Sequence, residues 1–241
     1  MALTDSVKDK VLRSTGFFEG NDGYSTTTGN FDGQGLSFGI IQFNFGQSSL
    51  QPLLKDYINN YNSEFTSVFG SSKAATLKDV VFNKTLAQQI QWGASISTSG
   101  GDVNSEWKPL FKNMGAKSAN QALQRQHAGQ YFNRAETFAN DFGIISTQGL
   151  AFLFDHAVQS WSFSGYTQSQ IRAEISRDES LWHQTGEKGR YPDYNRLYTV
   201  LKGVKGSDPI ARRTAIRNGS GTVHGKLYRV SDFGLSYNTN F

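Results

Sequence analysis

Apolar residues recur with helical spacing along most of the chain, and a polar, glycine-rich stretch at residues 20–35 interrupts them. Spacings of three and four residues between apolar positions are typical of helices that bury one face. This pattern, with matching cap residues, predicts helices within residues 50–61, 76–96, 118–141, 146–161 and 207–219. We expect the segment 146–161 to be the central buried helix, because it is apolar nearly throughout.

The N-terminal pattern predicts a shorter helix that is capped at Thr4 or Asp5 and ends near Gly16. Residues 24–28 have the composition of a strand, and residues 36–45 are apolar enough to be buried as either helix or strand. We therefore predict a mainly α (α+β) fold. A single domain spans residues 1–241, with a small β-containing lobe near residues 20–40.

Composition narrows the function classes. The 241 residues include no cysteine and four histidines without the HExxH spacing, so neither thiolate metal sites nor a zinc hydrolase is expected, and we predict no cofactor. The N-terminus lacks a signal-peptide pattern, and no apolar run suffices for stable membrane insertion. The net charge of +4 suits an anionic polymer as partner, but the sparse basic clusters argue against nucleic acid.

The richest candidate for chemistry is a pair of carboxylates in unlike surroundings. Glu19 follows two phenylalanines at the end of the first helix, whereas Asp32 stands in a glycine-rich turn. Glycosidic cleavage needs one protonated and one ionised carboxyl group, and apolar neighbours favour the protonated form. We assign Glu19 as the acid and Asp32 as the base, with Ser37 holding the water. The alternative is an ordinary Asp-Gly turn beside a solvated glutamate.

The segment DGQGLSFGIIQF, residues 32–43, resembles the Asp-Gly-Arg-Gly-Tyr-Thr-Gly-Gly-Ile-Ile-Gly-Phe segment of chitosanases in the lysozyme-like superfamily. The resemblance implies a helical fold with a β lobe flanking a substrate cleft, with Glu19 as general acid and Asp32 as general base. Ser37 falls at the threonine that helps to position the nucleophilic water. Three departures weaken specificity for chitosan: a shorter gap between the two acids, Gln34 for the arginine, and Ser37 for the threonine.

A second resemblance covers about residues 15–230. The blocks TGNFDGQGLSFGIIQFNFGQSSLQPLL, GLAFLFDHAVQ and ARRTAIRNGSGTVHGKLY are similar to peptidoglycan-hydrolase domains of bacteria and phages. Because chitosan is a polycation and this chain is basic, we favour an inverting muramidase acting on peptidoglycan glycan strands. Chitosanase and a non-catalytic wall-binding module stay as alternatives. We expect synthesis in the cytoplasm and action on the cell wall after release as a phage endolysin or delivery as an effector. The oligomeric state stays open.

Further polar residues complete the expected site. Substrate contacts are predicted for Asp22, Tyr24, Gln34, Gln42 and His224. Asp22 fits a second base or a turn equally well, and the glycine-rich context of His224 favours a turn histidine. Asp155 and Gln159 lie one helical turn apart on the buried segment, and a buried carboxylate needs a partner. That partner is expected among Arg212, Arg213 and Arg217; the alternative is that these arginines form a solvated face. His156 is expected to pack, as are most of Trp92, Trp107, Trp161 and Trp182.

Overall fold

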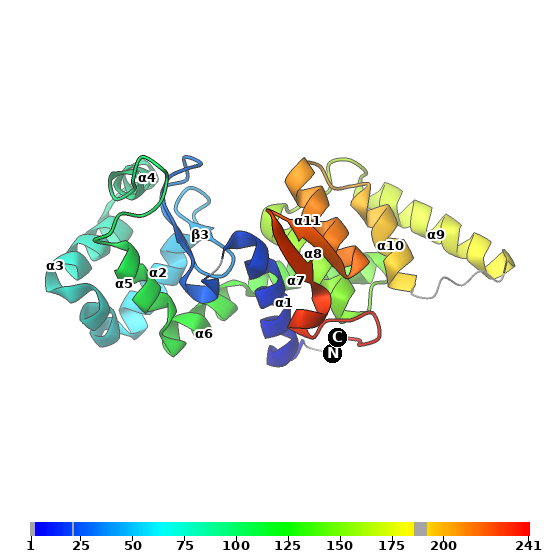
Figure 1. Ribbon diagram of the computed structural model, residues 1–241, viewed down its shortest axis with the longest axis horizontal. Coiled ribbons are helices and arrows are strands. Elements are labelled where there is room, and N and C mark those ends of the chain that lie inside the picture. The colour runs from blue at the N-terminus through cyan, green and yellow to red at the C-terminus, as the bar shows by residue number, and fades with distance from the viewer. Residues whose placement is uncertain (1–2, 21, 186–191) are drawn as a thin grey trace. The chain divides into compact units, whose positions relative to one another are not determined.

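The computed structural model describes residues 3–20, 22–185 and 192–241, and it divides the chain into two compact units. Unit 1 comprises residues 1–18 and 129–241, and unit 2 is the continuous segment 19–128. Figure 1 shows the chain coloured along its length. Within the described ranges, helices dominate and strands are short, which confirms the predicted mainly α fold. The single catalytic domain over 1–241 stays a prediction, because a division into two compact units does not show whether either unit folds alone.

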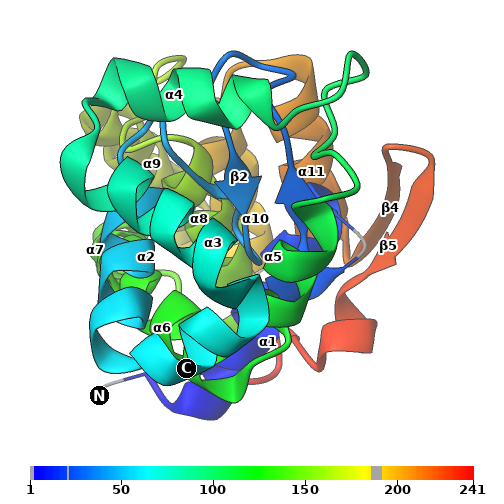
Figure 2. The ribbon, with the colours of Figure 1, turned by 90° about the vertical axis from the view of Figure 1, so that its left-hand side faces the viewer.

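Unit 2 consists of helices and three short strands (Figure 2). In chain order its elements are η1 (Gly23–Ser25), β1 (Thr27–Thr28), β2 (Ser37–Phe38), β3 (Phe43–Asn44), α2 (Leu50–Asn60), α3 (Asn62–Asn83), α4 (Leu86–Ser95), α5 (Lys108–Gly115) and α6 (Ser118–His127). The helix α3 bends at Gly70, whose φ of +70° leaves the helical region. These elements contain the predicted β lobe.

The strands form an antiparallel sheet in the order β1–β2–β3. Thr28, Ser37 and Asn44 pair across it in one row, and Thr27, Phe38 and Phe43 pair in the next. Because side chains alternate between the two faces of a sheet, the phenylalanine row enters the core and the polar row lies on the opposite face. The segment 36–45, which the sequence left open as helix or strand, is thus a strand pair joined by a turn.

Unit 1 combines helices from both parts of the chain. They are α1 (Asp5–Glu19), α7 (Gly129–Phe142), α8 (Thr147–Gln159), α9 (Gln168–Thr185), α10 (Pro192–Leu201) and α11 (Ser207–Asn218), followed by the hairpin β4 (Ser220–Val223) and β5 (Lys226–Arg229), then η2 (Val230–Phe233). The side chains of α8 from Thr147 to Ala157 are all buried, and α7 and α11 pack against this helix. The prediction of α8 as the central buried helix is therefore confirmed.

Several boundaries differ from the sequence predictions. The first helix continues through Gly16 to Glu19, because buried Phe18 packs against Tyr228 and this tertiary contact extends the helix past the glycine. The predicted helix 118–141 is two helices that meet at Ala128. Tyr24 lies in a 3₁₀ turn rather than in a strand. The helices α5, α9 and α10 and the terminal hairpin were not predicted.

Candidate active site

Two nested side-chain turns hold the Asp32 loop. The Oδ1 atom of Asn30 accepts from the Gly35 N–H at 2.7 Å, and the Oδ1 atom of Asp32 accepts from the Gln34 N–H at 3.1 Å. Gly33 and Gly35 have φ values of +79° and +81°, which glycine adopts without strain. Asp32 is exposed, and no described residue other than Gln34 hydrogen-bonds to its carboxylate. One carboxylate oxygen is therefore available to water.

The segment 97–103 supports this loop from unit 2 itself. Ser97 Oγ accepts from the Asn30 N–H at 2.9 Å and donates to the Gly93 carbonyl at 2.7 Å. A Cβ atom on Gly29 would lie 2.8 Å from the Gly101 carbonyl oxygen, so the two main chains are in direct contact. The loop that presents Asp32 is thus held by a second loop rather than projecting alone.

Ser37 occupies the centre of the polar strand row. It is 4% exposed, and its cross-strand neighbours are Thr28 and Asn44. Thr28 donates from Oγ1 to Gln42 at 2.8 Å, and Asn44 accepts from the Gln47 N–H at 2.7 Å. Both neighbours are therefore held in place by hydrogen bonds. Ser37 follows Asp32 by five residues in the sequence, and its role in positioning water stays a prediction.

Glu19 is the last residue of α1 and is half-buried. The ring of Phe18 stacks on Tyr228 with centroids 4.8 Å apart, and Phe17 contacts Tyr228 and Phe233 edge-on. The guanidinium of Arg212 lies 4.8 Å from the centre of the Phe18 ring. The two phenylalanines therefore fix the end of the helix through an aromatic cluster. The assignment of Glu19 as a protonated acid stays a prediction.

Asp22 and Tyr24 each have a cationic neighbour. Asp22 Oδ2 lies 2.7 Å from Lys112 Nζ. Arg125 donates to the Tyr24 hydroxyl at 3.4 Å, and its guanidinium lies 5.7 Å from the ring centre. An ion-paired Asp22 fits the turn interpretation of this residue better than the second-base interpretation. Substrate contacts by the two residues stay predictions.

The side chains of Gln34 and Gln42 both contact the main chain of the lobe. Gln34 packs on Gly46, where a Cβ atom would lie 2.0 Å from the Gln34 Oε1 atom. Gln42 donates to the carbonyls of Thr26 and Gly39 at 3.3 and 2.9 Å, and it accepts from Thr28. Gln42 adopts a φ of +54°, and these bonds stabilise that turn. Its predicted contact with substrate stays untested.

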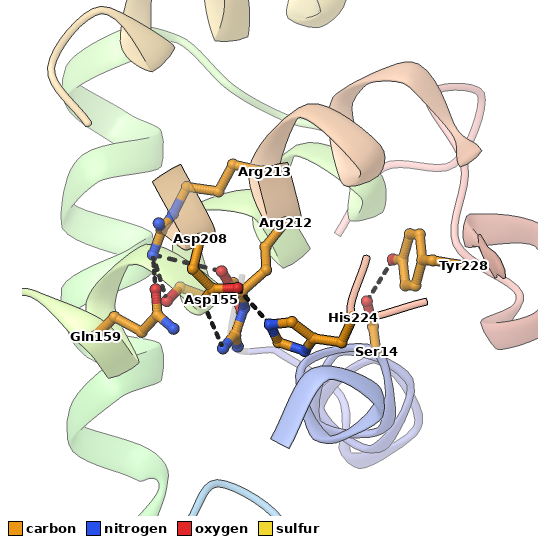
Figure 3. Close-up of polar contacts among 8 residues, drawn as sticks. All are labelled: Ser14, Asp155, Gln159, Asp208, Arg212, Arg213, His224 and Tyr228. Atoms are coloured by element: carbon orange, nitrogen blue, oxygen red, sulfur yellow. Dashed lines mark hydrogen bonds and ion pairs between the residues drawn. The ribbon is translucent and has the colours of Figure 1, made fainter. Parts of the chain in front are cut away.

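His224 lies in unit 1, at the turn of the β4–β5 hairpin. Its Nε2 atom bonds to Asp208 Oδ1 at the start of α11, as Figure 3 shows. Both side chains are about half-exposed. The contact joins the hairpin to the helix, and the sequence did not indicate Asp208 as the partner of this turn histidine.

The predicted partners of Asp155 are confirmed as Arg212 and Arg213 (Figure 3). Arg212 Nη2 bonds to Asp155 Oδ1, and Arg213 Nη2 lies 3.4 Å from Oδ2. Arg213 also donates to Gln159 Oε1 at 3.1 Å. All three charged side chains are at most 2% exposed. This buried network joins α8 to α11, so the solvated-face alternative is wrong for Arg212 and Arg213.

Next to this network, His156 is packed as expected. Its ring stacks on Phe163 with centroids 4.0 Å apart. Burial, aided by the charges of Arg213 and Arg134, lowers the pKa of His156 to about 3. Trp92 and Trp107 contact each other edge-on in unit 2, whereas Trp161 is half-exposed. The side chain of Trp182 lies outside the described residues.

Neither a metal cluster nor a membrane span is found where the structure describes the chain. Within residues 3–20, 22–185 and 192–241, no group of three His, Asp or Glu side chains is placed to hold a metal ion. In the same ranges, no helix is long and apolar enough to cross a membrane.

Two features of the site were not predicted from the sequence. Phe31, directly before Asp32, is 69% exposed, and Lys112 neutralises Asp22 from ninety residues away. A phenylalanine among glycine and polar residues is visible in the sequence and could have indicated the first feature. The Lys112 contact could not be predicted from the sequence, because it depends on how α5 packs against η1.

Comparison with known proteins gives structural matches only. No protein-family model matches the sequence, and no curated protein sequence matches it. The native chitosanase of Bacillus subtilis MY002 is 13% identical, with a TM-score of 0.59 over 100% of this chain and 99% of that chain. A mutant of that enzyme complexed with 6 GlcN is 13% identical, with a TM-score of 0.55 over 95% and 98% of the two chains.

The Gynuella sunshinyii GH46 chitosanase, complexed with chitotetraose, is 12% identical. It aligns with a TM-score of 0.54 over 95% of this chain and 98% of that one. At such identities the similarity establishes the fold, which is the helix-rich, lysozyme-like fold of these chitosanases. The expected fold is therefore confirmed over essentially the whole chain.

Proposed function

We propose that the protein is a glycoside hydrolase that cleaves β-1,4 bonds in polymers of amino sugars. The observation that carries the proposal is the Asp32 loop, where a water-accessible carboxylate is held by nested turns five residues before the buried Ser37. This loop occurs on a fold similar to that of chitosanases along its full length. Glu19, at the end of α1, supplies the second carboxyl group that such a reaction needs.

In the proposed reaction, Glu19 donates a proton to the glycosidic oxygen as the bond to the anomeric carbon breaks. Asp32 accepts a proton from the attacking water, whose oxygen bonds to the anomeric carbon from the opposite face. Ser37 orients that water. The products are two shorter glycans, the anomeric configuration is inverted, and both carboxyl groups return to their starting states when protons exchange with solvent.

Chitosan is the first candidate substrate, since the similarity to chitosanases favours it over the peptidoglycan that the sequence favoured. Peptidoglycan is the second candidate, and the charges of unit 2 support it. Several acids of unit 2 are paired with lysines, as in Asp22–Lys112, Asp102–Lys108 and Asp79–Lys84. Paired carboxylates attract a cationic glycan less than free ones do. Action on a cell wall after release or delivery belongs to this second candidate.

The test is to incubate the purified protein with soluble chitosan and with purified peptidoglycan, and to identify products by mass spectrometry. New reducing ends on either polymer are expected, and proton NMR of the fresh product should show the inverted anomer. Glu19→Gln and Asp32→Asn should each lower turnover by about 10²–10⁴-fold, whereas Asp22→Asn should retain it. Absence of new reducing ends on both polymers, or free peptide termini with intact glycan, would overturn the proposal.

A further inference from the structure

Phe31 is the most exposed large hydrophobic residue among those that the structure describes. Its side chain is 69% exposed, and it directly precedes Asp32. The other aromatic side chains in the described part of the chain do not stack on its ring, and no lysine or arginine lies over it. Leaving an apolar ring in water forgoes roughly 25 cal/mol for each Å² that burial would remove. The fold therefore gains little packing energy from this ring.

The main chain under the ring is nonetheless tightly held. The Phe31 N–H donates to the Gly29 carbonyl at 3.0 Å, and the Asn30 N–H donates to Ser97 Oγ at 2.9 Å. A Cβ atom on Gly101 would lie 2.5 Å from Phe31 Cβ, and Gly101 has a φ of +79°. Only glycine fits such an approach at such a φ. The segment 97–103 therefore backs Phe31 as well as Asp32.

An exposed aromatic ring on a well-held main chain, directly before an acid, suits sugar recognition. In β-1,4-linked glucosamine and its N-acetyl form, the ring substituents are equatorial, so both faces of the pyranose present axial C–H bonds. Such a face is apolar and flat, and it buries well against an aromatic ring while the hydroxyls stay at the rim. Because Phe31 has no hydroxyl or charge, this contact does not depend on the nitrogen substituent.

We propose that Phe31 is a substrate-stacking residue, on which the pyranose next to the cleaved bond lies. The inference rests on the proposed function, since Asp32 defines the position of that bond. Phe31 contributes affinity for amino-sugar glycans of either kind and positions the chain over Asp32. It therefore acts on binding, whereas discrimination between the two polymers comes from charged groups elsewhere.

The experiment measures glycan binding in full-length Glu19→Gln protein, where turnover is expected to be strongly reduced. Chitosan hexamer and a peptidoglycan tetrasaccharide are the probes, and isothermal titration gives Kd. Phe31→Ala should raise Kd about tenfold for both probes, and Phe31→Trp should leave it within about threefold. Phe82→Ala is the matched control, because Phe82 is an exposed phenylalanine of α3 in the same unit.

In protein with intact Glu19, Phe31→Ala should raise KM several-fold and leave kcat within about twofold. An unchanged Kd in Phe31→Ala would overturn the inference while Glu19→Gln and Asp32→Asn still support the proposed function. If wild-type protein neither binds nor cleaves a glycan, both proposals fail together. Loss of binding to lipid vesicles in Phe31→Ala, with glycan binding unchanged, would assign the ring to a membrane surface and overturn the inference.

Discussion

Lys112 Nζ lies 2.7 Å from Asp22 Oδ2, so the acid nearest in sequence to Glu19 is neutralised by a lysine of α5. The pair is about half-exposed, and its contribution to folding is therefore small. The pair has a larger effect on the charge that a ligand encounters, because an Asp22 without its lysine would add one negative charge to unit 2. This pair makes Lys112 a candidate determinant of polymer choice.

Replacing Lys112 with glutamine should improve the use of chitosan, since it exposes the Asp22 carboxylate to the ammonium groups of that polymer. We expect kcat/KM on chitosan to rise about two- to fivefold at low salt, with little gain at high salt where the charge is screened. Initial rates at two ionic strengths measure the effect.

The matched control for this change is Lys84→Gln, which frees Asp79 from a similar exposed pair at the end of α3. Equal gains in the two variants would mean that net charge alone acts. A lower rate on chitosan in Lys112→Gln would contradict the role assigned to the pair.

Ser37 should contribute through one hydrogen bond to the attacking water. Ser37→Ala is expected to lower kcat about tenfold and leave KM almost unchanged, because a neutral hydrogen bond is worth about 1–1.5 kcal/mol. Ser37→Thr keeps the hydroxyl and should retain most of the rate. If Thr and Ala lower kcat equally, packing of the buried side chain explains the loss instead.

The Asp155 network should matter for stability. Asp155→Leu removes the partner of two guanidinium groups that are at most 2% exposed, and we expect the free energy of unfolding to fall by about 3–5 kcal/mol. Urea denaturation followed by circular dichroism measures the change. Asp9→Ala breaks the exposed pair with Arg13 and should cost under about 1 kcal/mol. Similar losses in both variants would contradict the prediction.

His156 should make stability depend on pH below neutrality. Burial holds its pKa at about 3 in the folded chain, below the ordinary value of 6.5. Between these values the unfolded chain binds a proton that the folded chain does not. The free energy of unfolding is therefore not lowered by His156 above about pH 6.5. Below that pH it falls by about 1.4 kcal/mol per pH unit toward pH 3.

The measurement for His156 is the free energy of unfolding of wild type and His156→Leu between pH 8 and pH 4. Acidic residues titrate in both proteins, so the difference between the two curves isolates the histidine. As pH falls, the free energy of unfolding of wild type should decrease more than that of His156→Leu. Parallel curves would contradict a buried neutral histidine.

The helical half of the fold was predictable because its residues repeat a strong local pattern. Continuous apolar character made α8 evident, and Asp155 within it required a cation that the arginines of α11 supply. The Asp32 turn was also readable, because glycine and asparagine encode it locally. The end of α1 was not, since Phe18 extends it through a contact with Tyr228 more than two hundred residues away.

The side-chain partners of the predicted site were harder to foresee for the same reason. Asp22 pairs with Lys112, and His224 pairs with Asp208, because separate elements pack together. Gln42 satisfies its own turn rather than presenting a free amide. A residue type identifies which atoms can bond, but only the fold decides which of those bonds are already occupied.

The division of the chain into units also predicts an order of assembly. The hydroxyls of Ser14 and Tyr228 lie 2.6 Å apart, yet these residues are separated by 214 positions. During synthesis the whole of residues 19–128 emerges long before β5, so unit 2 can fold while α1 still lacks its partner. The helix α1, which ends in Glu19, is therefore among the first segments synthesised and among the last to form its tertiary contacts. We expect nascent chains that stop short of β5 to carry a folded Asp32 loop and no activity.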